Sequence, residues 1–165
     1  MASGSRLALL LAVVVLSGAA IGCGEDGAAE GAKLNVYVSA PLQGDQGEAG
    51  KVICAEAREE ARQAGSPGGF ELRVVCLDAA GPKGRWTLAQ VGANARRATE
   101  DSATVAYLGE PSRAARRQSQ PIVEAAGIAE LGALSGKEAM AKVAAAIEES
   151  DSGDPRRAVF DAVEG

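Results

Sequence analysis

The sequence predicts a single α/β domain with a three-layer, doubly wound parallel sheet. Three observations predict it. Short β-rich runs alternate with longer segments whose apolar residues recur at helical spacing. The composition is 47% hydrophobic but only 3% aromatic, which favours a core of aliphatic side chains. The length of 165 residues suits one domain with some terminal sequence. Strands that alternate with helices form parallel sheets with right-handed crossovers.

The first half of the chain predicts two strands and the helix between them. LNVYVSA at residues 34–40 is β-rich and is followed by a proline and a glycine-containing loop. Residues 47–64 then predict a helix. Its expected inward face consists of Ala49, Ile53, Ala57, Ala61 and Ala64. After the turn-forming SPGG, FELRVVCL at residues 70–77 predicts the second strand, which Asp78 ends.

The next segments predict a helix, a strand and a second helix. The first of these helices opens at residues 86–87, and its expected inward residues are Leu88, Val91, Ala95 and Ala98. TVAYLG at residues 104–109 predicts the third strand. Residues 111–112 cap the following helix, whose expected inward residues are Ala115, Ile122, Val123 and Ala126. We expect Pro121 to kink this helix, because proline lacks an N–H and its ring crowds the preceding turn.

The carboxyl-terminal part predicts a weak strand and two helices. GIAELGAL at residues 127–134 is the fourth candidate strand. The helix after Gly136 is expected to turn Met140, Val143, Ala144 and Ile147 inward. Asp154 and Pro155 form an N-cap followed by a proline in the first helical position, which is typical of a helix start. The inward residues of this last helix are Val159, Phe160 and Val163.

A ligand of such a sheet binds beyond the carboxyl ends of the strands. In this chain those ends are followed by residues 41–47, 78–85, 109–113 and 132–135. Asp78 stands in the second of these loops, so we expect it to be a ligand-binding residue.

The composition argues against several classes of function. The chain has no histidine, which removes the usual general base near neutral pH and the commonest metal ligand. Its three cysteines lack the spacing of a zinc site, so we expect no metal and no catalytic residues. The net charge of −5 argues against nucleic acid as a partner. No cofactor motif is present, and an enzyme is the least favoured class.

The amino terminus predicts export. Arg6 precedes the apolar run LALLLAVVVL, and small residues follow, which is the pattern of a secretory signal peptide. The run is too short for a comfortable membrane span of about 20 residues. The next four residues, AIGC, resemble a bacterial lipobox that ends at Cys23. This resemblance implies a lipoprotein signal peptide over residues 1–22, a lipid attached to the Cys23 thiol, and a flexible tether over residues 23–33. The alternative is an ordinary signal peptide with Cys23 free.

The remaining two cysteines form an even pair in an oxidising compartment. Cys54 lies beside the apolar face of the first helix, and Cys76 lies on the following strand. The sequence leaves two alternatives open at this point, a disulfide between Cys54 and Cys76 or two buried thiols packed side by side.

Several segments together resemble a known family. NVYVSAPLQGDQGEAG, GRWTLAQVGANARRATEDSATVAYLGEPS and PIVEAAGI are similar to the first lobe of periplasmic binding proteins. The type is the leucine-binding-protein-like lipoproteins of branched-chain amino acid ABC importers. The resemblance implies a lobe over residues 34–165, with first-lobe βα units over 34–132 and carboxyl-terminal helices over 136–165. It implies an amino acid as the ligand, an ABC permease as the partner, and a membrane-anchored lipoprotein on the extracytoplasmic face of the cell envelope.

The resemblance also suggests where the ligand binds. The family's first lobe holds the ligand's amino and carboxylate groups with a serine after the third strand and with small or hydroxyl residues after the fourth. The family serine falls on Arg113, with Ser112 just before it, and the second segment falls on Leu134, Ser135 and Gly136. Ser112, Arg113 and Ser135 are therefore candidate ligand-binding residues. Arg113 would meet a carboxylate bidentately or would be an exposed residue of the first helical turn.

The length differs from the family pattern. GKEAMAKVAAAIEESDSGDPRRAVFDAVEG resembles the family's carboxyl-terminal stretch, yet it follows the first lobe directly. We therefore expect the chain to lack a second lobe. Two functions remain, a lipid-anchored solute-binding protein for branched-chain or similar amino acids, and an anchored scaffold or interaction module that kept the fold and lost the ligand.

Overall fold

Four parallel strands form the central sheet of the computed structural model, which describes residues 32–132, 134–151 and 153–165. The strands are β1 (Lys33–Ala40), β2 (Glu71–Asp78), β3 (Thr104–Leu108) and β4 (Ala129–Glu130). Their spatial order is β2-β1-β3-β4, and every neighbouring pair is parallel. β1 therefore lies in the interior of the sheet, between β2 and β3. The doubly wound α/β prediction is confirmed.

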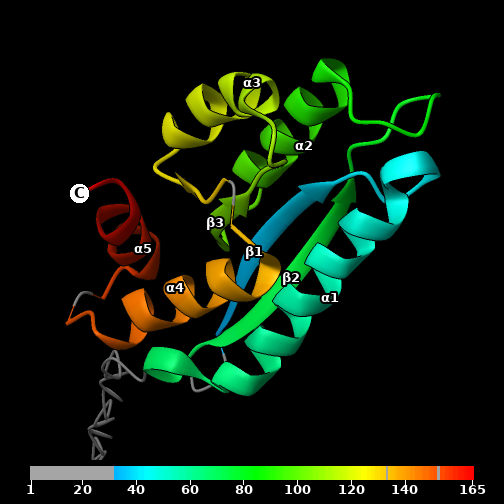
Figure 1. The fold of residues 1–165 in the computed structure, drawn as a ribbon. Coiled ribbons are helices and arrows are strands. Elements are labelled where there is room, and N and C mark those ends of the chain that lie inside the picture. Colours follow the sequence, from blue (N-terminus) through cyan, green and yellow to red (C-terminus); the bar gives the residue numbers. More distant parts are fainter. Residues whose placement is uncertain (1–31, 133, 152) are drawn as a thin grey trace, which may run out of the picture.

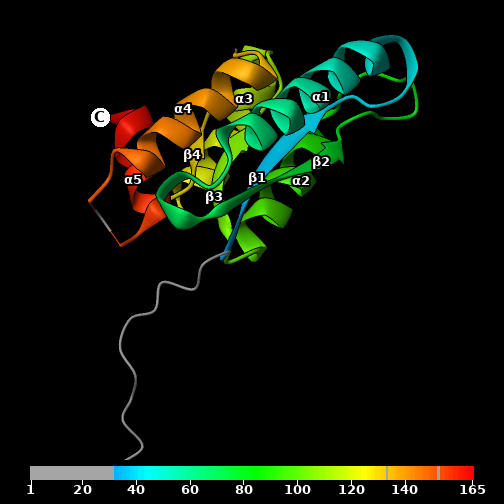
Figure 2. The ribbon, with the colours of Figure 1, turned by 90° about the horizontal axis from the view of Figure 1, so that it is seen from below.

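Helices cover both faces of the sheet (Figures 1 and 2). They are α1 (Gly47–Ala64), α2 (Leu88–Glu100), α3 (Arg113–Glu124), α4 (Gly136–Glu148) and α5 (Pro155–Glu164), with short 3-10 turns η1 (Gly44–Gln46) and η2 (Pro67–Gly69). α1, α4 and α5 pack on one face, and α2 and α3 pack on the other. The sheet therefore lies between two layers of helices, which gives three layers.

Each face of the sheet has its own core, because the side chains of a strand alternate between faces. Val36 and Val38 of β1 join the cluster under α1, α4 and α5. Tyr37 of β1 and Tyr107 of β3 join the smaller cluster under α2 and α3. The chain's few aromatic residues therefore include two that fill the thinner of the two cores.

Several expectations about inward residues were wrong. The buried face of α1 is Gly47, Gly50, Cys54, Ala57 and Ala61, and Ala49 is exposed. The face is turned because α1 approaches the end of β1 at Gly50, where a Cβ atom would lie 1.8 Å from the Pro41 carbonyl oxygen. On α2, Leu88 is 52% exposed because core contacts begin one turn later, at Val91. The fourth strand, expected over residues 127–134, has only two residues, Ala129–Glu130. Pro121 lies inside α3.

A disulfide joins Cys54 of α1 to Cys76 of β2, which is the first of the two alternatives that the sequence left open. The two Cα atoms are 6.1 Å apart, within the range that a disulfide spans. Cys54 is buried and Cys76 is partly buried against the same core. The bond therefore fixes the long first helix to the edge strand of the sheet.

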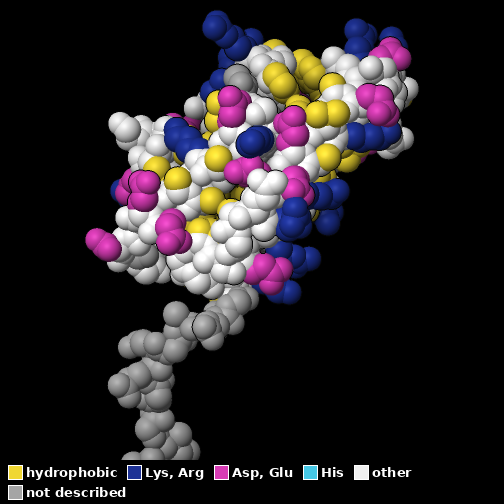
Figure 3. Space-filling model, turned by 60° about the horizontal axis from the view of Figure 1, so that its bottom comes forward, with side chains coloured by type: hydrophobic (Ala, Val, Ile, Leu, Met, Phe, Trp, Pro, Cys, Tyr) yellow, Lys and Arg dark blue, Asp and Glu magenta, His cyan; other side chains and the backbone are white. Residues whose placement is uncertain are grey.

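The exposed side of α1 and α4 carries charges of both signs (Figure 3). Lys51 pairs with Glu48 and Arg62 pairs with Glu59, each three residues apart on α1. These pairs are solvent-exposed, so they contribute little to stability.

The expected signal peptide, Cys23 and most of the expected tether lie outside the described residues. β1 begins at Lys33, one residue before the expected start of the lobe. Among the residues that the structure describes, no helix is long and apolar enough to cross a membrane.

We predict that removal of the disulfide destabilises the fold. Closing the loop between positions 22 apart stabilises by about 3 kcal/mol in the chain-entropy account. The double variant Cys54→Ser/Cys76→Ser is expected to unfold at lower denaturant concentration than the oxidised wild type. Reduction of the wild type is expected to produce a similar shift and to leave the variant unchanged. Equal stability of all four samples, or free thiols at both positions in the oxidised wild type, would contradict the bridge.

Candidate functional site

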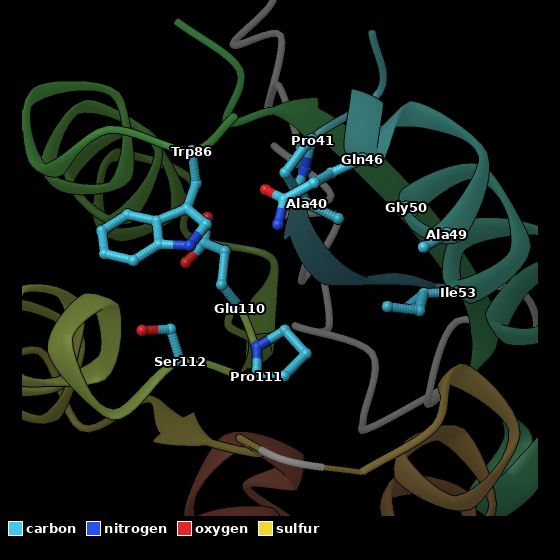
Figure 4. Close-up of a pocket in the computed structure, with 10 residues that line it drawn as sticks. All are labelled: Ala40, Pro41, Gln46, Ala49, Gly50, Ile53, Trp86, Glu110, Pro111 and Ser112. Atoms are coloured by element: carbon cyan, nitrogen blue, oxygen red, sulfur yellow. The ribbon is translucent and has the colours of Figure 1, made fainter. Parts of the chain in front are cut away.

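A pocket of about 390 Å³ lies beyond the carboxyl ends of β1 and β3. At this point the sheet order reverses, because the helix after β1 and the helix after β3 leave the sheet on opposite faces. Such switch points are where doubly wound sheets bind ligands. The pocket is lined by Ala40, Pro41, Gln46, Ala49, Gly50, Ile53, Trp86, Glu110, Pro111 and Ser112 (Figure 4). Most of these side chains are apolar, and three are polar.

Two loops meet beside the pocket to form its outer wall. Gly44 in the β1–α1 loop and Gly84 in the β2–α2 loop both have positive φ, at 69° and 66°. A Cβ atom on Gly44 would lie 2.2 Å from the Gly84 Cα atom, so the contact requires glycine. This contact sets the positions of Gln46 and Trp86, which follow the two glycines and line the pocket.

Asp78 fastens the same two loops together. Its Oδ1 atom accepts hydrogen bonds from the backbone N–H groups of Leu42 (2.9 Å) and Ala80 (2.8 Å), and its Oδ2 atom accepts one from the Gln43 amide (2.6 Å). Burial acts to raise the pKa of Asp78, but these hydrogen bonds outweigh it and hold the pKa below its usual value. Asp78 does not line the pocket. Its position in the structure is that of a loop-positioning residue.

Ser112 is the one predicted site residue that lines the pocket. It is the N-cap of α3, and its hydroxyl oxygen accepts a hydrogen bond from the Ala114 N–H (3.3 Å). The following residue, Arg113, is exposed and lines a separate depression with Arg116, Arg117 and Gln120. The structure therefore separates Ser112 from Arg113, although they are adjacent in sequence.

Ser135 occupies an equivalent position on another helix. It is the N-cap of α4 and forms a capping box with Glu138, in which the Ser135 hydroxyl oxygen accepts from the Glu138 N–H (3.2 Å). The Glu138 carboxylate accepts in turn from the Ser135 N–H (3.0 Å). Ser135 does not line the pocket between β1 and β3.

A buried polar cluster lies under the pocket, on the face covered by α2 and α3. Ser39 donates a hydrogen bond to Glu110 Oε1 (2.6 Å), and the Asn94 amide donates one to the Ser39 hydroxyl (2.9 Å). Glu110 is fully buried and its Oε2 atom has no hydrogen-bond partner. Burial raises the pKa of Glu110, with partial opposition from the Ser39 hydrogen bond. A buried oxygen of this kind costs roughly 1–3 kcal/mol when it is left unpaired.

Glu130 of β4 is the second buried carboxyl of this cluster. Ser119 of α3 donates a hydrogen bond to its Oε1 atom (2.9 Å), and Oε2 has no partner. Burial raises the pKa of Glu130 to about 7, against the Ser119 hydrogen bond and the positive charge of Arg116. Gly109 lies so close that a Cβ atom there would be 2.3 Å from Glu130 Oε1.

Burial also acts on the aromatic residue between these two carboxyls. The pKa of Tyr107 is raised mainly by burial and also by the charge of Glu110. Its hydroxyl has no hydrogen-bond partner. Three unpaired polar atoms therefore lie close to the carboxyl edge of the sheet.

The sequence-based interpretation missed Gln46, Trp86 and Glu110 as pocket residues, and Glu130 as a buried acid. A signal was present for both glutamates, because Glu130 interrupts the apolar run GIAELGAL and Glu110 follows the buried run TVAYLG directly. Charged residues are almost never fully buried without a partner, so a glutamate at the end of a buried strand indicates a special position. Gln46 and Trp86 gave no such signal.

Within residues 32–132, 134–151 and 153–165, no group of three or more His, Cys, Asp or Glu side chains is placed to hold a metal ion. No family model matches the chain, and no curated protein matches it.

Solved structures do share the fold. The branched-chain amino acid substrate-binding protein LivJ from Streptococcus pneumoniae, determined in complex with isoleucine, matches with a TM-score of 0.51 and 16% identity over 61% of this chain and 28% of that one. The chain has the fold of a periplasmic-binding-protein lobe.

Two further matches are similar in kind. The leucine-binding protein LivK from Thermotoga maritima has a TM-score of 0.48 and 22% identity over 59% of this chain and 26% of that one. An ABC transporter substrate-binding protein from Sphaerobacter thermophilus has a TM-score of 0.47 and 20% identity over 59% of this chain and 25% of that one. The chain spans about a quarter of the length of these three solved chains.

We predict that Glu130 makes the stability of the lobe depend on pH. Burial in the folded protein raises the pKa of its carboxyl from the usual 4.5 to about 7. Raising the pH through this interval therefore lowers the free energy of unfolding, by on the order of 3 kcal/mol. Glu130→Gln is expected to equal the wild type near pH 4 and to be more stable at pH 8, as measured by denaturant unfolding. The exposed Glu100→Gln serves as the control and should follow the wild type. A variant with no advantage at pH 8 would show that Glu130 does not titrate in this way.

Proposed function

We propose that the chain is a lipid-anchored, extracytoplasmic solute-binding protein of an ABC importer, and that the switch-point pocket binds a branched-chain amino acid. The observation that carries the proposal is the pocket itself. It lies at the edge where this fold binds ligands, and its volume falls within the range of about 300–1,000 Å³ typical of small-molecule sites. The likeness to a protein determined with isoleucine supports the choice of ligand class.

The chemistry of the pocket fits such a ligand. Ile53, Pro41 and Pro111 offer apolar surface to a branched side chain. Ser112 stands at the amino terminus of α3, where the helix dipole favours an anion such as the ligand carboxylate. In the proposed complex the Ser112 hydroxyl donates a hydrogen bond to that carboxylate while its oxygen still caps the helix.

A second candidate function is a scaffold or interaction module that kept the fold without the ligand. One observation favours it. Asp78, Arg113 and Ser135 lie outside the pocket, and the polar groups of Asp78 and Ser135 are already engaged in hydrogen bonds within the chain. The binding experiment below separates the two functions.

We predict that Ser112→Ala weakens the binding of leucine, isoleucine or valine by about tenfold, the usual effect of losing a hydrogen bond to a charged group. Isothermal titration calorimetry on the purified protein provides the measurement. Ser135→Ala is the matched control, because it removes the same hydroxyl from the N-cap of another helix outside the pocket. Each substitution costs about 1 kcal/mol of stability through the lost cap, so only binding distinguishes them. If none of the three amino acids binds at millimolar concentration, the scaffold function is favoured.

The lipid anchor requires a separate test. We predict that cells expressing the chain incorporate a labelled fatty acid into it, and that Cys23→Ser abolishes the labelling and releases the protein from the membrane fraction. Cys54→Ser provides the control, because that thiol belongs to the disulfide. Labelling that persists in Cys23→Ser would place the lipid elsewhere and remove the basis for the anchor.

A further inference from the structure

Glu110 is an unusual residue for the wall of an apolar pocket. It lies two residues after the end of β3, lines the switch-point pocket and is fully buried. One carboxyl oxygen accepts the hydrogen bond from Ser39, and the other has no hydrogen-bond partner. A carboxylate out of water without a partner for one oxygen is destabilising. Natural proteins tolerate such a local cost mainly at functional positions.

The surroundings of Glu110 supply no compensating positive charge. Among the described residues, the Lys and Arg side chains that form ion pairs do so with Glu48, Glu59, Glu71 and Asp161 and not with Glu110. Its hydrogen-bond donor is the neutral Ser39, which is held by the neutral Asn94 amide. The site therefore has an unfilled place for a cationic hydrogen-bond donor.

Glu130 shows that burial of a carboxyl group alone does not create a binding place for a cation. It has the same pattern of one oxygen bonded to a serine and one unpaired. Glu130, however, feels the positive charge of Arg116 and does not line the pocket. Only Glu110 of this pair combines an unpaired buried oxygen with a position on the pocket wall. The two residues thus form a natural comparison.

A place that favours an anion lies two residues further along the chain, at Ser112. Ser112 and the amino terminus of α3 favour an anionic group in the same pocket. The pocket thus combines a carboxyl group that favours a cation, a helix amino terminus that favours an anion, and apolar surface. These three features match a zwitterion with an aliphatic side chain. Resting on the function proposed above, we infer that Glu110 is the residue that selects ligands with an ammonium group, and so distinguishes an α-amino acid from the corresponding keto acid.

Trp86 allows ligand binding near Glu110 to be followed by fluorescence. In the view of Figure 4 the side chain of Glu110 points toward the indole of Trp86, and both line the pocket. Because Glu110 is shielded from solvent, an ammonium group reaches its free oxygen only if the side chains in front of it shift. Trp86 is the only tryptophan of the chain, so its fluorescence reports binding at this wall.

The experiment compares leucine with 4-methyl-2-oxopentanoate, which has the same side chain and carboxylate but no ammonium group. Both are titrated into the wild type, Glu110→Gln and Glu130→Gln, and Trp86 fluorescence and calorimetry follow binding. We expect the wild type to prefer leucine by about tenfold or more, since a hydrogen bond to a charged group contributes this much. Glu110→Gln is expected to lose the preference, and Glu130→Gln to keep it. Thermal unfolding confirms that each variant is folded.

The outcomes separate this inference from the proposed function. A wild type that binds both compounds equally overturns the role of Glu110 and leaves the amino acid pocket standing. The same holds if folded Glu110→Gln retains the preference, or if Glu130→Gln loses it equally. The wild-type comparison needs no variant, so the inference stays testable even if Glu110→Gln does not fold. If neither compound binds the wild type, the proposed function fails and this inference fails with it.

Discussion

The fold depends on one topological constraint, the divergence of the chain after two neighbouring parallel strands. β1 and β3 lie side by side, and α1 and α3 leave them toward opposite faces of the sheet. Right-handed crossovers make this divergence unavoidable once β2 and β4 take the two edges. Nothing regular fills the space beyond the two strand ends, so a pocket forms there. The close approach of α1 at Gly50, the Gly44–Gly84 contact and the hydrogen bonds of Asp78 all shape that space.

The carboxyl edge of the sheet departs from ordinary packing. The cores on both faces consist mainly of Val, Ala, Leu and Ile side chains. At this edge two buried carboxyls and a tyrosine hydroxyl keep unpaired polar atoms. Natural proteins tolerate such local costs mainly at functional positions. The disulfide between α1 and β2 lies on the other face of the sheet, under α1, and stabilises the scaffold that holds this edge in place.

Much of the fold was predictable from the sequence, because apolar periodicity and turn residues fixed the elements. α1 has the expected bounds, and the N-caps Ser112 and Asp154 are confirmed. On α1, Ala57 and Ala61 are buried as expected, but Ala49 is exposed. The buried glycines Gly47 and Gly50 were missed because glycine carries no hydrophobic signal. The residues of the pocket were harder to predict from the sequence than the helices and strands. Ser112, which lines the pocket, was predicted through a resemblance. Glu110 and Trp86 reach the pocket through tertiary packing between βα units, which local sequence does not encode. Asp78 was placed on the correct edge, yet hydrogen bonds to neighbouring loops occupy it.

We propose that an amino acid binds at the switch point between β1 and β3. The most direct measurement is a leucine titration of the isotopically labelled protein, followed by ¹H–¹⁵N correlation spectra. We expect the largest shifts at the backbone amides of residues 110–114 and at the single indole N–H of Trp86. Shifts confined to the distant depression lined by Arg58 and Arg73, or no shifts at millimolar leucine, would contradict it.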